Sequence, residues 1–196
     1  SNSLLKNVGI VLNDMGVVYS KNVSFSNFSI APLASYTLKD NTIIGSWSNS
    51  YYNYNCYAYA IGRSSGLQPG QLSGTSFSLT MSISEMANVV LEDLSSLGYW
   101  GYTSTSKPSS LPDEYFKVIA MRKDTSNVDY HFMKPYGSLN TWAHKPGGTQ
   151  PLKWKYSSPG YKIWNNEAVI NGVTYAPTVT YESTIVYIIY KSWNDP

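Results

Sequence analysis

The clearest hydrophobic pattern in the chain lies between residues 82 and 98. Apolar side chains recur there every three or four positions, as on one face of an α-helix, at Ile83, Met86, Ala87, Val90, Leu91, Leu94 and Leu97. Ser82 and Glu85 have the spacing of a capping box, in which each side chain accepts a hydrogen bond from a backbone N–H at the start of the helix. Gly98 stands where a left-handed C-terminal residue is expected. The pattern predicts a helix that begins after Ser82 and ends before Gly98.

A second, shorter helix is predicted around Cys56. Asn55 is a favourable N-cap residue, and the run from Cys56 to Ile61 ends at Gly62 or Arg63. A loop rich in glycine, serine and proline follows, from Ser64 to about Thr80.

Strand patterns occupy most of the remaining chain. We expect short strands in residues 8–40, with turns at Asn13-Asp14 and Asp40-Asn41. Further strands are expected at 115–121, as a hairpin over 129–145, and as three or four strands from Lys153 to the C-terminus. The run 184–190 is apolar on both faces, which predicts a place inside the sheet. The order of elements indicates the α+β class.

Composition limits the classes of function. The chain has 196 residues, of which 42% are hydrophobic and 13% charged, so it is too apolar for intrinsic disorder. It contains no run of about 18 apolar residues, and we expect no membrane span. The net charge of +2 comes from scattered basic residues and argues against a nucleic-acid partner. The 18 tyrosines and the many Ser, Asn and Thr residues are typical of a secreted or cell-surface protein, and we expect a monomer.

The single cysteine excludes an intramolecular disulfide. Cys56 falls at the start of the predicted short helix, where unpaired N–H groups and the helix dipole stabilise a thiolate. The alternative is a small buried apolar residue.

No signal peptide is recognisable, because Lys6 interrupts the one candidate apolar run. Export would therefore use another route, or a signal segment that has already been removed.

The two histidines are expected to be neighbours. Gly137-Ser138 has the composition of a two-residue hairpin turn, which would pair Tyr136 with Leu139. Counting outwards from that turn puts His131 opposite His144, in a pair whose Cβ atoms lie about 4.5–5.5 Å apart.

Three interpretations of this set remain open. His131 and His144 could serve Cys56 as general base and orienting residue. All three could bind a zinc ion with one open position. The histidines could also be an ordinary cross-strand aromatic pair beside Trp142.

The order of these motifs resembles the NlpC/P60 branch of the papain-like cysteine peptidases. The segment Asn55-Cys56-Tyr57-Ala58 occupies the position of the nucleophile, and Leu111-Pro112-Asp113 is similar to the turn that precedes the histidine strand. The segments 129–134 and 141–145 are similar to the two strands that carry the base and the third residue. The resemblance covers about residues 50–150. The chain departs from it in having Asn-Cys-Tyr-Ala in place of Asp-Cys-Ser-Gly, in the inserted Tyr130 and in a long stretch before His131.

The resemblance implies a papain-like antiparallel sheet with the nucleophilic cysteine at a helix N-terminus. Residues 1–196 would form one catalytic domain, with 1–45 as an N-terminal β extension, 50–150 as the core and 151–196 as C-terminal strands. Cys56 would be the nucleophile, His131 the base and His144 the orienting residue, a role open also to Asn140.

The same resemblance suggests residues that touch the substrate. The backbone N–H of Cys56 and a side chain from the segment 51–55, with Tyr54 preferred and Asn55 as the neighbouring candidate, would stabilise the oxyanion. Asp129 would contact substrate or simply open the strand, and Trp142 would floor the cleft or only pack. No metal or other cofactor is implied.

The function expected from the sequence is therefore hydrolysis of an amide bond through a Cys56 thioester, with a peptide or a peptidoglycan-like cell-wall peptide as substrate. The enzymatic alternative is a protein-directed cysteine protease, deamidase or acyltransferase that acts as a toxin or effector. The non-enzymatic alternative is an aromatic-rich module that binds a ligand or zinc.

Overall fold

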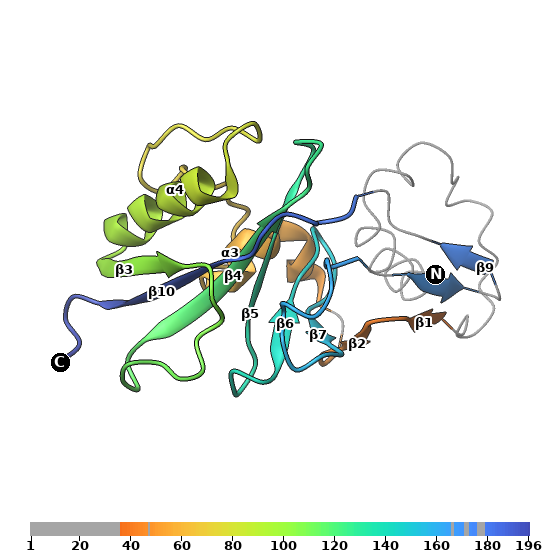
Figure 1. The fold of residues 1–196 in the computed structure, drawn as a ribbon. Coiled ribbons are helices and arrows are strands. Elements are labelled where there is room, and N and C mark those ends of the chain that lie inside the picture. Colours follow the sequence, from red (N-terminus) through yellow and green to blue (C-terminus); the bar gives the residue numbers. More distant parts are fainter. Residues whose placement is uncertain (1–35, 47, 166, 171–172, 176–178) are drawn as a thin grey trace.

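The structure, a computed structural model, describes residues 36–196 except 47, 166, 171–172 and 176–178 (Figure 1). A seven-stranded antiparallel sheet has the order β2-β7-β6-β5-β4-β10-β3. Its strands are β2 (Asn41–Ile43), β3 (Tyr99–Ser104), β4 (Lys117–Lys123), β5 (Tyr130–Pro135), β6 (Trp142–His144), β7 (Leu152–Trp154) and β10 (Val186–Ser192). A smaller sheet contains β1 (Tyr36–Leu38), β8 (Ala168–Ile170) and β9 (Val173–Tyr175). The helices are η3 (Asn49–Asn53), α3 (Cys56–Ala60) and α4 (Ile83–Ser96). The predicted α+β class is confirmed, whereas the strands predicted before residue 36 lie outside the described residues.

Both predicted helices form for the predicted reasons. The Ser82 hydroxyl accepts a hydrogen bond from Glu85 N (3.2 Å), and the Glu85 carboxylate accepts one from Ser82 N (2.7 Å), so the capping box of α4 is complete. Gly98 follows the helix at φ +89°, a conformation that favours glycine. The Asn55 side chain caps α3 by accepting a hydrogen bond from Ala58 N (3.1 Å).

The C-terminal strands are also placed as predicted. Strand β10 lies between β4 and β3, and its residues from Val186 to Lys191 are buried. The sequence pattern does not predict β3, because Gly101 interrupts it. The structure explains the glycine: a Cβ atom at residue 101 would lie 2.4 Å from the carbonyl oxygen of Ile189 on β10.

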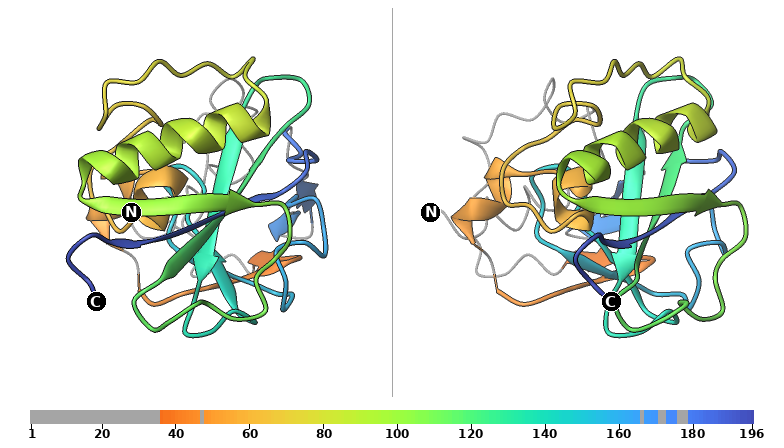
Figure 2. Two further views of the ribbon diagram at one scale, coloured as in Figure 1. Left: turned by 60° about the vertical axis from the view of Figure 1, so that its left-hand side comes forward. Right: turned by 90° about the vertical axis from the view of Figure 1, so that its left-hand side faces the viewer.

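Alternate residues of each strand divide the core into two clusters on opposite faces of the sheet. The helical face carries α3 and α4, and its buried residues include Cys56, Tyr57, Met86, Val90, Ile119, Met121, Tyr130, Phe132 and Ile188. Both views in Figure 2 show α4 packed along β3. The loop face is covered by connecting segments, and its buried residues include Phe116, Val118, Ala120, Met133, Trp142, Trp154, Trp164 and Ile189. No helix in the described part of the chain is both long and apolar enough to cross a membrane.

Candidate active site

The hairpin that carries the histidines forms, but with a longer turn than predicted. Tyr136 N donates to Thr141 O (2.7 Å), and Pro135 pairs with Trp142, so residues 137–140 make a four-residue loop. The predicted pairing of Tyr136 with Leu139 is therefore wrong by two residues, and His131 does not lie directly opposite His144. A shift of two residues leaves every side chain on its original face, because strand side chains alternate with a period of two.

The two imidazoles are neighbours, as predicted. His131 Nε2 lies 2.6 Å from His144 Nδ1, and His144 Nε2 lies 2.5 Å from the amide oxygen of Asn41 on β2. The amide oxygen can only accept, so His144 Nε2 carries a proton and its Nδ1 accepts the proton of His131 Nε2. The three side chains form a hydrogen-bonded chain across β5, β6 and β2, which we call the histidine relay.

The histidine relay lies on the loop face among aromatic rings. The His131 ring stacks on Tyr181 with centroids 5.1 Å apart, and the His144 ring meets the edge of Trp154 at 6.1 Å. Burial lowers the pKa of His131 to about 3 and holds that of His144 well below its usual range, with His131 adding to the effect on His144. Both imidazoles are therefore neutral at pH 7.

Cys56 lies on the other face of the sheet. It opens α3 and packs in the cluster that contains Tyr130 and Phe132, the two neighbours of His131 in β5. Consecutive strand residues point to opposite faces, so the His131 side chain points away from Cys56. Tyr57 and Phe132, with ring centroids 5.0 Å apart, fill the space between α3 and the sheet.

The thiol itself is protonated at neutral pH. Burial, reinforced by the negative charge of Asp129, raises the pKa of Cys56 to about 12. The backbone N–H groups of Phe132 and Tyr57 and the ammonium of Lys145 act in the opposite direction, but they do not outweigh the burial.

The predicted arrangement of Cys56, His131 and His144 as nucleophile, base and orienting residue is therefore not present in this structure. The sheet backbone separates the sulfur from both imidazoles, and Asn41 rather than Asn140 partners the second histidine. Asn140 instead accepts a hydrogen bond from Lys107 (3.3 Å) on the exposed side of the hairpin loop. The zinc-site alternative fails for the same reason, since no three His, Cys, Asp or Glu side chains gather as metal ligands among the residues described.

Lys145 is a buried charged group that holds the segment before Cys56 in place. Its ammonium is fully buried and donates to Tyr51 O (2.6 Å), Gly147 O (2.7 Å) and Tyr54 O. It also lies 4.2 Å from the centroid of the Tyr54 ring. Burial lowers the pKa of Lys145 to about 8. Three hydrogen bonds use all three protons of the ammonium, so Lys145 holds the segment before α3 rather than accepting a proton.

The other predicted contact residues are already engaged. The Asn55 amide oxygen caps α3 and the amide nitrogen donates to Leu67 O (2.6 Å), so the side chain is held in the cap of the helix. Asp129 accepts hydrogen bonds from Tyr181 (2.8 Å) and from Tyr130 N (2.8 Å), and burial raises its pKa. Trp142 is fully buried on the loop face, where its indole N–H donates to Leu139 O (2.9 Å). It packs, and does not line a cleft next to Cys56.

Sequence reasoning missed Asn41 and Lys145. Asn41 is 103 positions from its partner His144 and was assigned to a turn, and no local pattern relates the two residues. Lys145 follows His144 directly, so strand alternation could have placed it on the face opposite the histidines.

Comparison with protein-family models, with curated proteins and with solved structures finds no match to this chain.

Proposed function

We propose that the protein is a cysteine-dependent amide hydrolase in which Cys56 is the nucleophile and the two histidines have no direct role. The observation that carries the proposal is the set of groups around the sulfur: the N–H groups of Tyr57 and Phe132 and the ammonium of Lys145 all favour the thiolate. The same backbone N–H groups are the type of donor that stabilises an oxyanion. The position of Cys56 at the start of α3, on an antiparallel sheet, supports the resemblance to the NlpC/P60 branch.

The reaction follows from thiol chemistry. The sulfur attacks the carbonyl carbon of the amide and forms a thioester, and the amine leaves with the proton that the thiol gave up. Water then hydrolyses the thioester, which releases a carboxylic acid and restores the thiol. Because burial keeps the resting thiol protonated, the proposal requires that bound substrate lowers the pKa of Cys56 or supplies the proton acceptor. The proposed substrate class is a peptide, with a peptidoglycan-like cell-wall peptide as the first candidate.

The test is an activity screen with matched variants. Purified protein is incubated with peptidoglycan fragments and with unrelated proteins, and products are identified by mass spectrometry. We expect Cys56→Ala to abolish cleavage, while His131→Gln and His144→Gln retain it within about tenfold when folded fractions are compared. Cleavage by Cys56→Ala at the wild-type rate would overturn the proposal.

A second candidate is ligand binding without catalysis. The burial of Cys56, at 6% exposure, and the separation of the imidazoles from the thiol favour it. It predicts no product from either substrate class and no covalent adduct on Cys56 in the native protein.

A further inference from the structure

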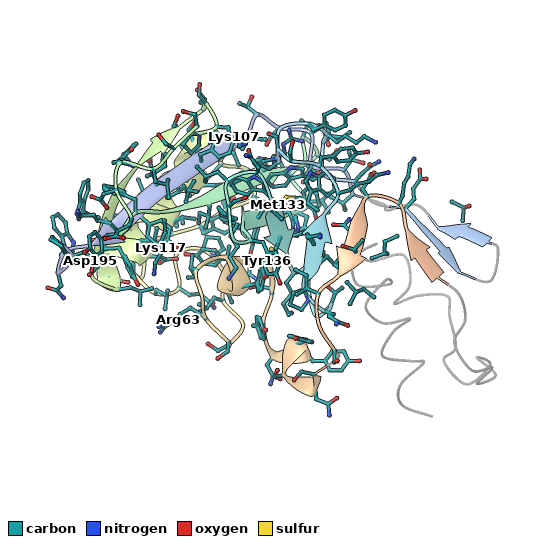
Figure 3. All side chains as sticks on the ribbon, turned by 90° about the horizontal axis from the view of Figure 1, so that it is seen from below. Arg63, Lys107, Lys117, Met133, Tyr136 and Asp195 are labelled. Atoms are coloured by element: carbon teal, nitrogen blue, oxygen red, sulfur yellow. The ribbon has the colours of Figure 1, made fainter. Side chains whose placement is uncertain are left out.

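A cavity of about 500 Å³ opens at one end of the seven-stranded sheet, where the start of β4, the β5–β6 loop and the residues after α3 meet. This volume lies in the range of small-molecule sites, about 300–1,000 Å³. Much of the wall is apolar and comes from Leu111, Phe116, Val118, Leu139 and Tyr190. Figure 3 looks onto this end of the molecule, where Lys117 and Tyr136 are labelled. The cavity includes neither Cys56 nor the histidine relay.

Both charged residues in the cavity wall are lysines, Lys117 and Lys134. Ala120 on β4 pairs with Met133 on β5, so the next pair in this antiparallel register is Ile119 with Lys134. Lys117 is two residues before Ile119 and therefore points to the same face as Lys134. The two ammonium groups therefore belong to one patch. The burial of Lys134, reinforced by the positive charge of Lys117, lowers the pKa of Lys134.

Neither lysine is neutralised within the described part of the chain. The ion pairs found there join Lys39 to Glu167, Lys162 to Asp40 and Lys191 to Asp113. Lys134 instead donates to Tyr59 O (2.9 Å) and lies 4.1 Å from the centroid of the Tyr59 ring, and Lys117 lies 5.3 Å from that of Tyr99. These contacts orient the ammonium groups but leave two positive charges beside an apolar wall without a counter-charge.

The hairpin loop adds a neutral donor to the same wall. The Ser138 hydroxyl oxygen accepts a hydrogen bond from Asn140 N (3.2 Å), and this bond does not use the hydroxyl proton. Gly137, at φ +80°, makes the bend that brings Ser138 to the cavity.

We propose that this cavity binds a small organic anion with an apolar body. Lys117 and Lys134 would pair with the anionic group, and Ile61 and Tyr190, which lie on the helical face with the two lysines, would pack against the body. An anion is favoured because it offsets the repulsion between the two lysines, and charge-assisted hydrogen bonds are stronger than neutral ones. A small molecule is favoured because the site is a bounded cavity rather than an extended surface.

The experiment compares two fluorescent probes that share one apolar body. The first is 1-anilinonaphthalene-8-sulfonate, which carries a sulfonate, and the second is N-phenyl-1-naphthylamine, which is uncharged. We expect one sulfonate probe per chain, with a Kd that rises about tenfold in Lys117→Gln and again in Lys134→Gln. Binding of the uncharged probe should be weaker in the wild type and unchanged by either substitution. Lys153→Gln, at an exposed position on β7, is the matched control and should bind both probes as the wild type does.

Equal sulfonate-probe affinity in Lys117→Gln and Lys153→Gln would overturn the proposal, as would several equivalent sites per chain. Lys117 is exposed, so its variant keeps the test valid if Lys134→Gln does not fold. Cys56→Ala, which removes the proposed nucleophile, should leave probe binding unchanged. Failure of the anion site and failure of the hydrolase proposal are thus separate results.

Discussion

The two faces of the seven-stranded sheet both bury polar groups, but only the loop face buries histidines. On the helical face, ionisable side chains hold backbone and hydroxyl groups. Asp93 of α4 accepts hydrogen bonds from the Tyr57 hydroxyl, from Gly70 N and from both the backbone and the hydroxyl of Ser73, and Lys145 donates to three carbonyl groups. On the loop face, the histidine relay joins two neutral imidazoles to an amide. Arg122 is also buried on the loop face and donates to Lys162 O and Tyr181 O, so both faces use charge to hold loops. What distinguishes the loop face is its pair of neutral imidazoles, which acid can protonate.

This contrast explains why the thiol and the imidazoles do not act together. Cys56 packs on the helical face with Tyr130 and Phe132. His131 stands between these two residues in β5, so its side chain lies on the loop face. One residue along a strand is enough to change faces, and no side chain crosses the sheet.

The largest expected effect comes from the charged contact on the helical face. Asp93→Ala removes a fully buried carboxylate that accepts four hydrogen bonds, including those of Gly70 N (2.7 Å) and Ser73 N (2.9 Å). We expect the free energy of unfolding to fall by about 3–5 kcal/mol, since the donors lose a charged partner. Urea unfolding measures the change. Glu92→Ala, at the neighbouring exposed position, is the control and should change stability by less than about 0.5 kcal/mol.

The corresponding substitution on the loop face should cost less. His144→Leu leaves His131 Nε2 and the Asn41 amide oxygen without their shared partner, at a cost of about 2–3 kcal/mol. The groups that lose a partner are neutral, which is why the effect is smaller than for Asp93→Ala. A larger loss for His144→Leu than for Asp93→Ala in the same urea series would contradict the contrast between the faces.

Acid should act mainly through the loop face. An unfolded histidine titrates near pH 6.5, whereas burial holds the pKa of His131 at about 3, so between these values the unfolded chain binds protons that the native chain does not. Stability is then lost as the pH falls through this window, by about 1.4 kcal/mol per pH unit for each buried imidazole. Unfolding measured from pH 7 to 4 should show a shallower slope in the double variant His131→Phe, His144→Leu. Identical slopes in variant and wild type would mean that the imidazoles are solvated.

The smallest effect is expected in the loop that joins β5 and β6. Gly137 has φ +80°, and a Cβ atom there would meet nothing within 4 Å, so Gly137→Ala costs only the conformational strain, about 1 kcal/mol. Gly101→Ala is the matched contrast, because its Cβ would clash with backbone on β10 and should cost several times more. Equal thermal unfolding midpoints for the two variants would contradict this difference in space between positions 137 and 101.

Local signals predicted much of the fold. The capping box at Ser82, the N-cap at Asn55 and the apolar run of β10 each depend on residues close in sequence, and the structure contains all three elements. The hairpin was predicted with the correct faces but the wrong turn, since Gly137-Ser138 fits a two-residue loop equally well.

The candidate site was predictable only in part. That His131 and His144 share a face follows from the alternation of side chains along the two strands of one hairpin. Their position relative to Cys56 depends on which face of the sheet α3 covers, and packing between distant segments decides that. Asn41 reaches His144 from β2 through pairings that no local pattern encodes.

The most direct test of the separation of Cys56 from the histidines is the rate of alkylation of Cys56 by iodoacetamide as a function of pH, in the wild type and in His131→Gln. Because burial raises the pKa of Cys56, the account predicts slow reaction in the native protein at neutral pH, an apparent pKa above the ordinary value of about 8.5, and the same profile in the variant. An apparent pKa well below 8.5 that moves upward in His131→Gln would place the imidazole beside the thiol and contradict the separation.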